Sequence, residues 1–345
     1  MGVGLVPELY APGELSGELI DGWLELAEED PGASWFATPD WVLAWWETLG
    51  RRGPAEIAVW RAADGTVEAV APLHRTSLRL HPRLPAAVRC LTPLGSGPGA
   101  ADHGTFACRP GRRAELRAWL GVLARRETLW LPDLDPGAAD LLPGGARRVA
   151  GQSCPRVGLA DGFEVLGSKQ FRSDLRRYGR KLAAAGVTFR WVAPGEADAG
   201  LLPAIVRLHR LRRDALGKGT TFDEDRLPLH RLLVSRARPG AGPAFLVAEH
   251  EGTVIGGLYG FLWRDTFAYY QIGWDPSWAP LRLGTAIIAE AVRACADQKL
   301  AVFDFLRGTE PYKYRFDATD REDTTWLAPH GPTGALLTLK HRLKG

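Results

Sequence analysis

One segment, from Tyr269 to Phe316, constrains the fold of this 345-residue chain more than any other. Residues Thr266–Trp274 are rich in aromatic side chains and end at Asp275-Pro276, which predicts a β-strand. A helix is expected to begin near Arg282, because apolar residues follow at helical spacing: Leu283, Ile287, Ile288, Ala291, Val292 and Cys295. A second strand is expected at Leu300–Phe305. The order strand, helix, strand is typical of an α/β domain.

The joint between this strand and helix, Pro280 to Ala286, combines a basic residue with glycine and small residues. The first N–H groups of a helix have no partner inside the helix, and the helix dipole favours an anion there. Gly284 lets a phosphate approach the backbone closely, and Arg282 adds a positive charge. These features predict a pyrophosphate-binding turn. The alternative is an ordinary loop-to-helix turn in which Gly284 serves only packing.

The sequence Arg282-Leu283-Gly284-Thr285-Ala286 resembles the pyrophosphate loop of the GNAT acyltransferases in its shortened form. Phe303-Asp304-Phe305, then Gly308 and Tyr312-Lys313-Tyr314-Arg315-Phe316, resemble the end of the CelD/BcsL-type branch, which is related to the FemAB aminoacyl transferases. Two runs near the N-terminus resemble the opening of the same branch: Phe36-Ala37-Thr38-Pro39-Asp40-Trp41 and Ala44-Trp45-Trp46. The resemblance covers most of the chain.

The resemblance implies an α/β (α+β) fold with two GNAT-like domains in tandem. Each would be a mixed, mainly antiparallel twisted sheet flanked by helices. We expect an N-terminal domain at residues 1–165 and a C-terminal acyltransferase domain at residues 166–345, with the acceptor bound between them. A repeated hairpin pattern supports two similar domains. Strands are expected to turn at Asp64-Gly65 and again at Glu251-Gly252, and each pair is followed by Thr-Val.

The same resemblance implies acyl-CoA (acetyl-CoA) as the co-substrate. Strand Tyr269–Trp274 would separate from Ala301–Phe305, and pantetheine would lie in the gap. A backbone N–H near Ile272–Gly273 would polarise the thioester carbonyl, because Gly273 permits a close approach. The expected cofactor-binding residues are Gln271, Ile272, Gly273, Leu281, Arg282, Leu283, Gly284, Thr285 and Ala286.

Acyl transfer to an amine needs a base for the acceptor and a group that stabilises the developing oxyanion. The expected base or acceptor anchor is Asp304, at the end of the second strand, with Glu310 as the runner-up. Lys313 is the candidate for oxyanion stabilisation, and FemAB-type relatives suggest a role for a lysine near this loop. The alternative for Asp304 is a structural ion pair with Lys313 or Arg307.

Further candidates are less specific. Tyr312 and Tyr314 either line the cleft, donate to the leaving thiolate, or pack in the core. Asp102-His103 follows a glycine-rich loop, and the resemblance places an acidic residue at this position, so Asp102 is a secondary site candidate. The loop itself, Gly95–Gly99, is expected to be a surface or cleft loop. No helix follows it at once, and its Pro98 has no N–H for a phosphate.

Residues Ser168–Ala185 predict a strongly basic helix whose other face is apolar. Its cations are Lys169, Arg172, Arg176, Arg177, Arg180 and Lys181, and Asp174 is its one acidic residue. The basic face is either solvated or contacts CoA phosphates, an anionic acceptor or RNA. A later loop, Leu216–Phe222, contains Gly217, Lys218 and Gly219 and is a candidate mobile lid.

Length and composition narrow the function further. A chain of 345 residues suggests two domains, and a net charge of +3 argues against a DNA-binding protein. We expect no membrane span and no signal peptide, because no run approaches the roughly 18 apolar residues that a span needs. The 4 cysteines and 8 histidines lack metal-ligand spacing, so we expect no metal. A reduced, cytoplasmic enzyme is the simplest interpretation.

We therefore expect an acyl-CoA-dependent N-acyltransferase whose acceptor is an amine on a small molecule, a glycan or a peptide. Two alternatives stay open. A FemAB-type transferase would take aminoacyl-tRNA as the donor, and its RNA binding would fall steeply with salt. A non-catalytic GNAT-like module in polysaccharide or cell-envelope biosynthesis would show no turnover even if it bound CoA.

Overall fold

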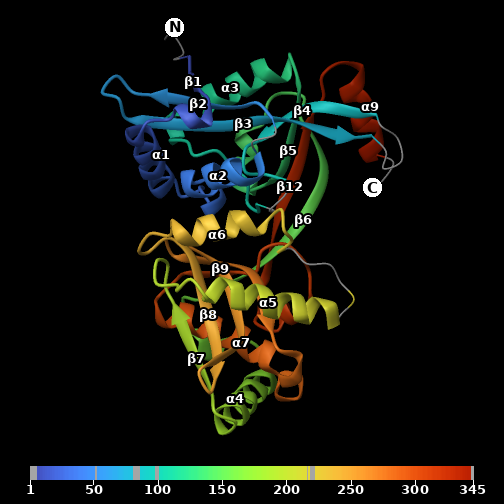
Figure 1. The fold of residues 1–345 in the computed structure, drawn as a ribbon. Helices are drawn as coiled ribbons and strands as arrows, with labels where there is room; N and C mark the ends of the chain where they lie inside the picture. The colour runs from blue at the N-terminus through green and yellow to red at the C-terminus, as the bar shows by residue number, and fades with distance from the viewer. Residues whose placement is uncertain are drawn as a thin grey trace. The chain divides into compact units, whose positions relative to one another are not determined.

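The computed structural model describes residues 6–50, 53–80, 86–97, 101–215, 217 and 222–342. The chain divides into unit 1, residues 1–152 and 322–345, and unit 2, residues 153–321 (Figure 1). This division differs from the predicted domains 1–165 and 166–345. Strand β6 (Arg147–Gly158) runs from unit 1 into unit 2, and β12 (Thr319–Ala328) runs back, so the C-terminal segment belongs to unit 1.

The sheet of unit 1 has the strand order β1-β2-β3-β4-β5-β12. Neighbouring strands are antiparallel except β4 and β5. The strands before β12 are β1 (Glu8–Tyr10), β2 (Ala55–Arg61), β3 (Val67–Arg79), β4 (Ala87–Pro93) and β5 (Thr128–Leu134). The helices are α1 (Gly17–Glu29), α2 (Pro39–Trp45), α3 (Arg113–Ala124) and α9 (Gly331–Arg342). Leu337 of α9 and Leu327 of β12 are buried together with Val88 and Cys90 of β4, which fixes the C-terminal segment in unit 1.

The tryptophans of α2 belong to the core of unit 1. Trp41 and Trp45 are 0% and 3% exposed. The Thr38 side chain caps the helix by accepting the N–H of Trp41. The indole N–H of Trp41 donates to the carbonyl of Gly95 at 3.0 Å, and Gly95 has a φ of 93°. The glycine-rich loop thus holds a core indole, while its continuation at Pro98-Gly99 lies outside the described residues.

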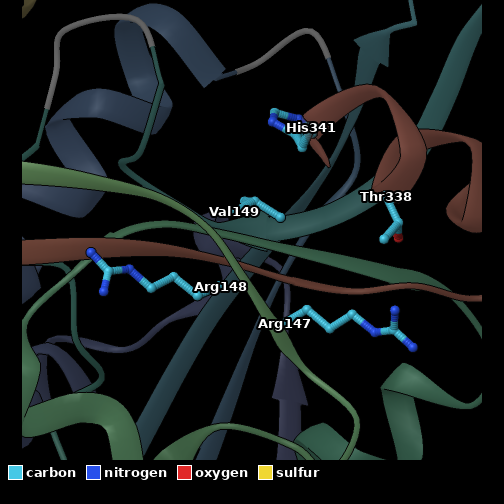
Figure 2. Close-up of a pocket in the computed structure, with 5 residues that line it drawn as sticks. All are labelled: Arg147, Arg148, Val149, Thr338 and His341. Atoms are coloured by element: carbon cyan, nitrogen blue, oxygen red, sulfur yellow. The ribbon is translucent and has the colours of Figure 1, made fainter. Parts of the chain in front are cut away.

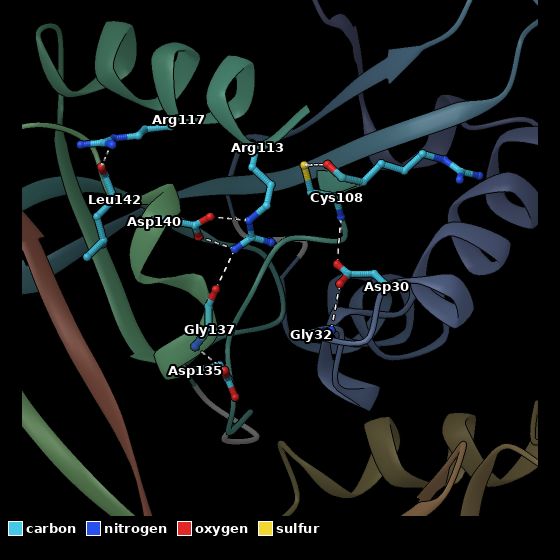
Figure 3. A network of polar contacts seen from close by, with 10 residues as sticks. Asp30, Gly32, Cys108, Arg113, Arg117, Asp135, Gly137, Asp140 and Leu142 are labelled. Carbon is cyan, nitrogen blue, oxygen red and sulfur yellow. Dashed lines mark hydrogen bonds and ion pairs between the residues drawn. The ribbon is translucent and has the colours of Figure 1, made fainter. Parts of the chain in front are cut away.

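Polar contacts hold the helical parts of unit 1 in place (Figure 3). The Arg113 guanidinium of α3 donates to the Asp140 carboxylate at 2.6 Å and to the Gly137 carbonyl at 2.7 Å. The Asp30 carboxylate, at the end of α1, accepts the N–H of Cys108 at 3.1 Å. Burial raises the pKa of the Cys108 thiol to about 12, so this cysteine is a core residue and not a nucleophile.

The sheet of unit 2 has the strand order β6-β11-β10-β9-β8-β7. Neighbouring strands are antiparallel except β10 and β11. Besides β6, the strands are β7 (Val187–Val192), β8 (Gly242–His250), β9 (Thr253–Trp263), β10 (Thr266–Trp274) and β11 (Val302–Asp304). The helices are α4 (Lys169–Ala184), α5 (Leu201–Ala215), α6 (Leu227–Ser235), α7 (Leu283–Asp297) and α8 (Pro311–Tyr314). No helix among the described residues of either unit is long and apolar enough to cross a membrane.

Different helices cover the two faces of the sheet in unit 2. A Cβ added at Gly256 would lie 2.6 Å from Ile287 of α7, and one at Gly257 would lie 2.2 Å from Ile205 of α5. Because successive residues of a strand point to opposite faces, α7 and α5 lie on opposite faces of the sheet. Each unit therefore contains a mixed, mainly antiparallel sheet flanked by helices, which confirms the predicted fold class.

His230 of α6 is expected to make the stability of the protein depend on pH. Its side chain is 0% exposed, its Nδ1 lies 3.2 Å from the Tyr259 hydroxyl oxygen, and burial lowers its pKa to about 3. An unfolded histidine takes up a proton near pH ~6.5, whereas folded His230 stays neutral. The free energy of unfolding should therefore fall as the pH drops from about 6.5 towards 3, by up to about 1.4 kcal/mol per pH unit.

Urea unfolding at several pH values between about 5 and 7 measures this dependence. In the variant His230→Phe, the free energy of unfolding should depend less steeply on pH. The difference in slope should correspond to about one proton. The same slope in both proteins would show that His230 is not the group responsible.

Candidate active site

The parallel pairing of β10 with β11 stops after three residues. Thr266, Phe267 and Ala268 pair with Val302, Phe303 and Asp304, whereas β10 stays paired with β9 as far as Trp274. The register with β9 shifts between Tyr269 and Gln271, which marks a bulge where the two strands part. Beyond Ala268, no strand among the described residues pairs with the other edge of β10. This confirms the expected separation, and such an edge can bind an extended ligand through its backbone.

The turn between β10 and α7 leaves backbone N–H groups at the helix start. Arg282 is exposed and has a left-handed backbone with a φ of 62°, and its carbonyl accepts the N–H groups of Thr285 and Ala286. The N–H groups of Leu283 and Gly284 have no acceptor among the described residues. Leu283 and Ala286 are buried, so they offer only backbone groups to a ligand. The helix start therefore combines free N–H groups, the positive end of a helix dipole and a guanidinium.

Two glycines of the predicted cofactor site have packing roles. A Cβ at Gly284 would lie 2.6 Å from Nε1 of Trp274, so the indole occupies the space beside Gly284. A Cβ at Gly273 would lie 2.4 Å from the backbone N of His209 and 2.7 Å from the carbonyl oxygen of Ile205, so α5 makes the close approach there. The structure thus supports the alternative interpretation, in which Gly284 is needed for packing. Gly273 has a similar packing role.

His209 of α5 was not singled out from the sequence. It is 2% exposed, and its Nδ1 lies 2.9 Å from the carbonyl oxygen of Ile272. Burial lowers the pKa of this histidine, so the neutral ring donates its Nδ1–H to that carbonyl. His209 therefore fixes α5 to the part of β10 where the strand edge is free.

Two tyrosine hydroxyls meet in the gap between β10 and the loop after β11. Tyr269 and Tyr312 share a hydrogen bond, and burial raises the pKa of Tyr312 to about 12 and that of Tyr269 well above its usual value. The charge of Arg212 on α5 acts on both phenols and lowers the pKa of each, whereas Glu310 raises it. The Arg212 guanidinium also lies 5.8 Å from the centre of the Trp274 ring. Sequence spacing gives no sign of this arginine, because α5 lies far from the motif in the chain.

Asp304 and Lys313 hold the loop that follows β11. The Asp304 side chain is 3% exposed and accepts the N–H of Leu306 at 2.8 Å. The Lys313 ammonium is 2% exposed and donates to the carbonyls of Arg307 and Gly308, each at 2.9 Å, and to that of Leu306 at 3.3 Å. It also lies 2.9 Å from the Glu310 carboxylate, whose side chain is 56% exposed. Both residues therefore have structural partners close to the tyrosine pair.

Replacing Lys313 with methionine should destabilise the protein by about 2 kcal/mol, because three carbonyls of the loop lose a charged donor. Chemical denaturation compares this variant with Lys181→Met, whose exposed side chain has no such partners among the described residues and should change stability by less than about 0.5 kcal/mol. Equal stability of the two variants would show that the ammonium does not hold the loop.

Asp102 belongs to unit 1, whereas the other candidate residues belong to unit 2. It is 2% exposed and stands beside His103, whose N–H donates to Asp323 at 2.6 Å and whose Nδ1 lies 2.9 Å from the same carboxylate. Asp323 is 0% exposed, so it anchors the loop of Asp102 to β12. The role of Asp102 in acyl transfer stays a prediction. The expected lid at residues 216–222 lies outside the described residues except for Gly217 and Phe222.

A cavity of about 450 Å³ in unit 1 is lined by Arg147, Arg148, Val149, Thr338 and His341 (Figure 2). Figure 2 shows the guanidinium groups of Arg147 and Arg148 pointing to opposite sides, and Arg148 pairs with Glu322. The two positive charges do not converge on one point, so this cavity lacks the geometry of a phosphate site.

Comparisons with known proteins agree with the geometry of unit 2. The family model described as "Acetyltransferase (GNAT) domain" matches residues 169–314, which include α4 to α8 and both Tyr269 and Tyr312. A search of the curated proteins found no match to the sequence.

Three solved structures resemble the chain over nearly its full length. FemX is 10% identical, with a TM-score of 0.66 over 97% of this chain and 100% of that one. L-PGS from Bacillus licheniformis is 13% identical, with a TM-score of 0.56 over 95% of this chain and 96% of that one. The C-terminal domain of a protein assigned as a lysylphosphatidylglycerol synthetase from Agrobacterium fabrum is 9% identical, with a TM-score of 0.60 over 94% of this chain and 95% of that one. At these identities the likeness concerns the fold.

The matched domain identifies an acyltransferase. Residues 169–314 form a GNAT acetyltransferase domain, and the fold of the chain resembles that of FemX.

Proposed function

We propose that unit 2 transfers an acyl group from acyl-CoA to an amine. The observation that carries this proposal is the release of β10 from β11 next to the start of α7. The free edge of β10 suits the amide groups of pantetheine, and the N–H groups of Leu283 and Gly284 with Arg282 suit the pyrophosphate. These are the chemical needs of a long, extended thioester donor that ends in phosphates.

The residues around the gap supply the proton transfers. The amine nitrogen attacks the thioester carbon, the C–S bond breaks, and the sulfur takes a proton from the Tyr312 hydroxyl. The exposed carboxylate of Glu310, held by Lys313, accepts the proton that the amine loses. Asp304 and Lys313 keep the loop in place, and the Arg212 charge stabilises the tyrosinate until it is reprotonated.

Aminoacyl-tRNA is the second candidate donor, because the fold resembles FemX over the full chain. Such a donor would not need the pyrophosphate turn at α7. The two donors can therefore be separated by experiment.

Thiol release from acetyl-CoA in the presence of a panel of amines tests the proposal, with mass spectrometry to detect the acetylated product. We expect release that depends on the amine and a product heavier by one acetyl group. Turnover with charged tRNA and none with any short acyl-CoA would replace this proposal by the second candidate.

A further inference from the structure

Helix α4 presents its positive charges on one face of unit 2. Phe171 and Leu182 are buried in the core, where α4 packs on α7. The opposite face consists of exposed basic residues at helical spacing: Lys169, Arg176, Arg177, Arg180 and Lys181. From Lys169 to Arg180 this basic face is about 16 Å long, at a rise of about 1.5 Å per residue.

Little of this charge is balanced by the residues that the structure describes. Arg177 pairs with Asp174 at 2.7 Å, and no ion pair of Lys169, Arg176, Arg180 or Lys181 exists among the described residues. Arg176 and Arg180 are four residues apart, and like charges at that spacing destabilise a helix. A basic face that is kept in spite of this repulsion fits an anionic partner.

The C-terminal end of α4 lies near the turn that leads into α7. The end of α4 is next to Gly186, which lies beside the ring of His250. That ring contacts Trp278, at 5.0 Å between ring centres, in the turn Pro276–Leu281 that leads into α7. A partner bound to α4 would therefore lie near the turn at which the phosphate of a bound pantetheine donor is expected.

The surface chemistry favours an acidic protein over other polyanions. Proteins that bind single-stranded RNA add exposed aromatic rings for stacking, but Phe171 of α4 is buried and Tyr178 is half-buried. A membrane-binding helix inserts apolar side chains, whereas the apolar face of α4 is packed in the core. A row of arginines and lysines on a rigid helix complements a row of carboxylates on a partner helix.

We propose that the basic face of α4 binds an acidic acyl carrier protein, whose phosphopantetheine thioester is then an acyl donor for the site in unit 2. This inference rests on the proposed function. CoA and a carrier protein share the pantetheine thioester and differ in what lies beyond its phosphate. The reaction is the same for both: the amine forms the C–N bond, the C–S bond breaks, and the carrier leaves as its free thiol with one proton.

The test compares the binding of an acetylated, fluorescently labelled acyl carrier protein to three proteins by anisotropy. These are the wild type, the double variant Arg176→Glu/Arg180→Glu and the matched control Arg125→Glu/Arg126→Glu, which reverses two exposed charges in unit 1. We expect the α4 variant to bind the carrier at least about 10-fold more weakly and the control to bind it like the wild type. Thiol release from acetyl-CoA should be the same in all three.

An equal loss of acetyl-CoA turnover in the α4 variant would overturn the inference, because the face would then bind CoA itself. Failure of the wild type to bind the carrier, or tighter binding of tRNA or of anionic vesicles through the same arginines, would also overturn it. If none of the three proteins acetylates an amine from either donor, the proposed function is wrong. If the α4 variant loses only carrier binding, the carrier site on α4 is supported separately from the proposed function.

Discussion

Gly273→Ala is expected to lower the free energy of unfolding by about 3 kcal/mol or more. The added methyl group would lie 2.4 Å from the backbone N of His209 and 2.7 Å from the carbonyl oxygen of Ile205. Both atoms belong to the backbone of α5, so no side chain can rotate away, and the helix itself must move. Urea denaturation measures the loss.

The matched control is Gly158→Ala. Gly158 also lies in a strand of unit 2, and an added Cβ there would meet no atom of the described residues within 4 Å. This variant should be as stable as the wild type or more stable by up to about 1 kcal/mol. Similar stabilities for the two variants would contradict the close contact between α5 and β10.

Tyr312→Phe is expected to reduce kcat for acyl transfer about 100-fold or more, because the leaving thiolate loses its proton donor. Burial raises the pKa of Tyr312 to about 12, so the phenol stays protonated throughout the neutral and mildly alkaline range. The wild-type rate should therefore show no loss attributable to this group up to a pH of about 10. Steady-state kinetics with a saturating donor measures the effect.

Tyr314→Phe serves as the control on the same short helix. Tyr314 is 37% exposed, and its hydroxyl donates to Asp320 at 2.8 Å. Its loss should change kcat less than about two-fold and should leave KM for the donor unchanged. An unchanged kcat in Tyr312→Phe, or an equal fall in both variants, would remove Tyr312 from the proposed chemistry.

The sequence was informative where structure depends on neighbours in the chain. The apolar spacing after Arg282 predicted α7, and Asp64-Gly65 predicted the hairpin of β2 and β3, with a φ of 93° at Gly65. The resemblance also pointed to the separation of β10 from β11. Local periodicity and turn chemistry are sufficient for such features.

Features that depend on distant contacts could not be read in this way. The path of β12 back to unit 1 follows from its pairing with β5, which no local pattern reports. A glycine in the sequence indicates a close approach but not which atom approaches, so a ligand and the backbone of α5 were equally compatible with Gly273. Arg212 lies near Tyr269 and Tyr312 only because α5 packs against β10.

The start of α7 offers a sharp variant for the cofactor. Gly284→Trp would collide with the Trp274 indole and disturb the fold, so it cannot isolate the loss of a ligand. Thr285→Glu is better, because a carboxylate in the first turn favours the helix and repels a phosphate. Thr333→Glu is its matched control, since Thr285 and Thr333 are each the third residue of a helix, α7 and α9.

Calorimetric titration of acetyl-CoA into the wild type, Thr285→Glu and Thr333→Glu tests the central claim most directly. We expect the wild type and Thr333→Glu to bind with a dissociation constant in the micromolar range and Thr285→Glu to bind at least about 10-fold more weakly. Absence of binding to the wild type, or equal binding to all three proteins, would contradict a pyrophosphate site at the start of α7.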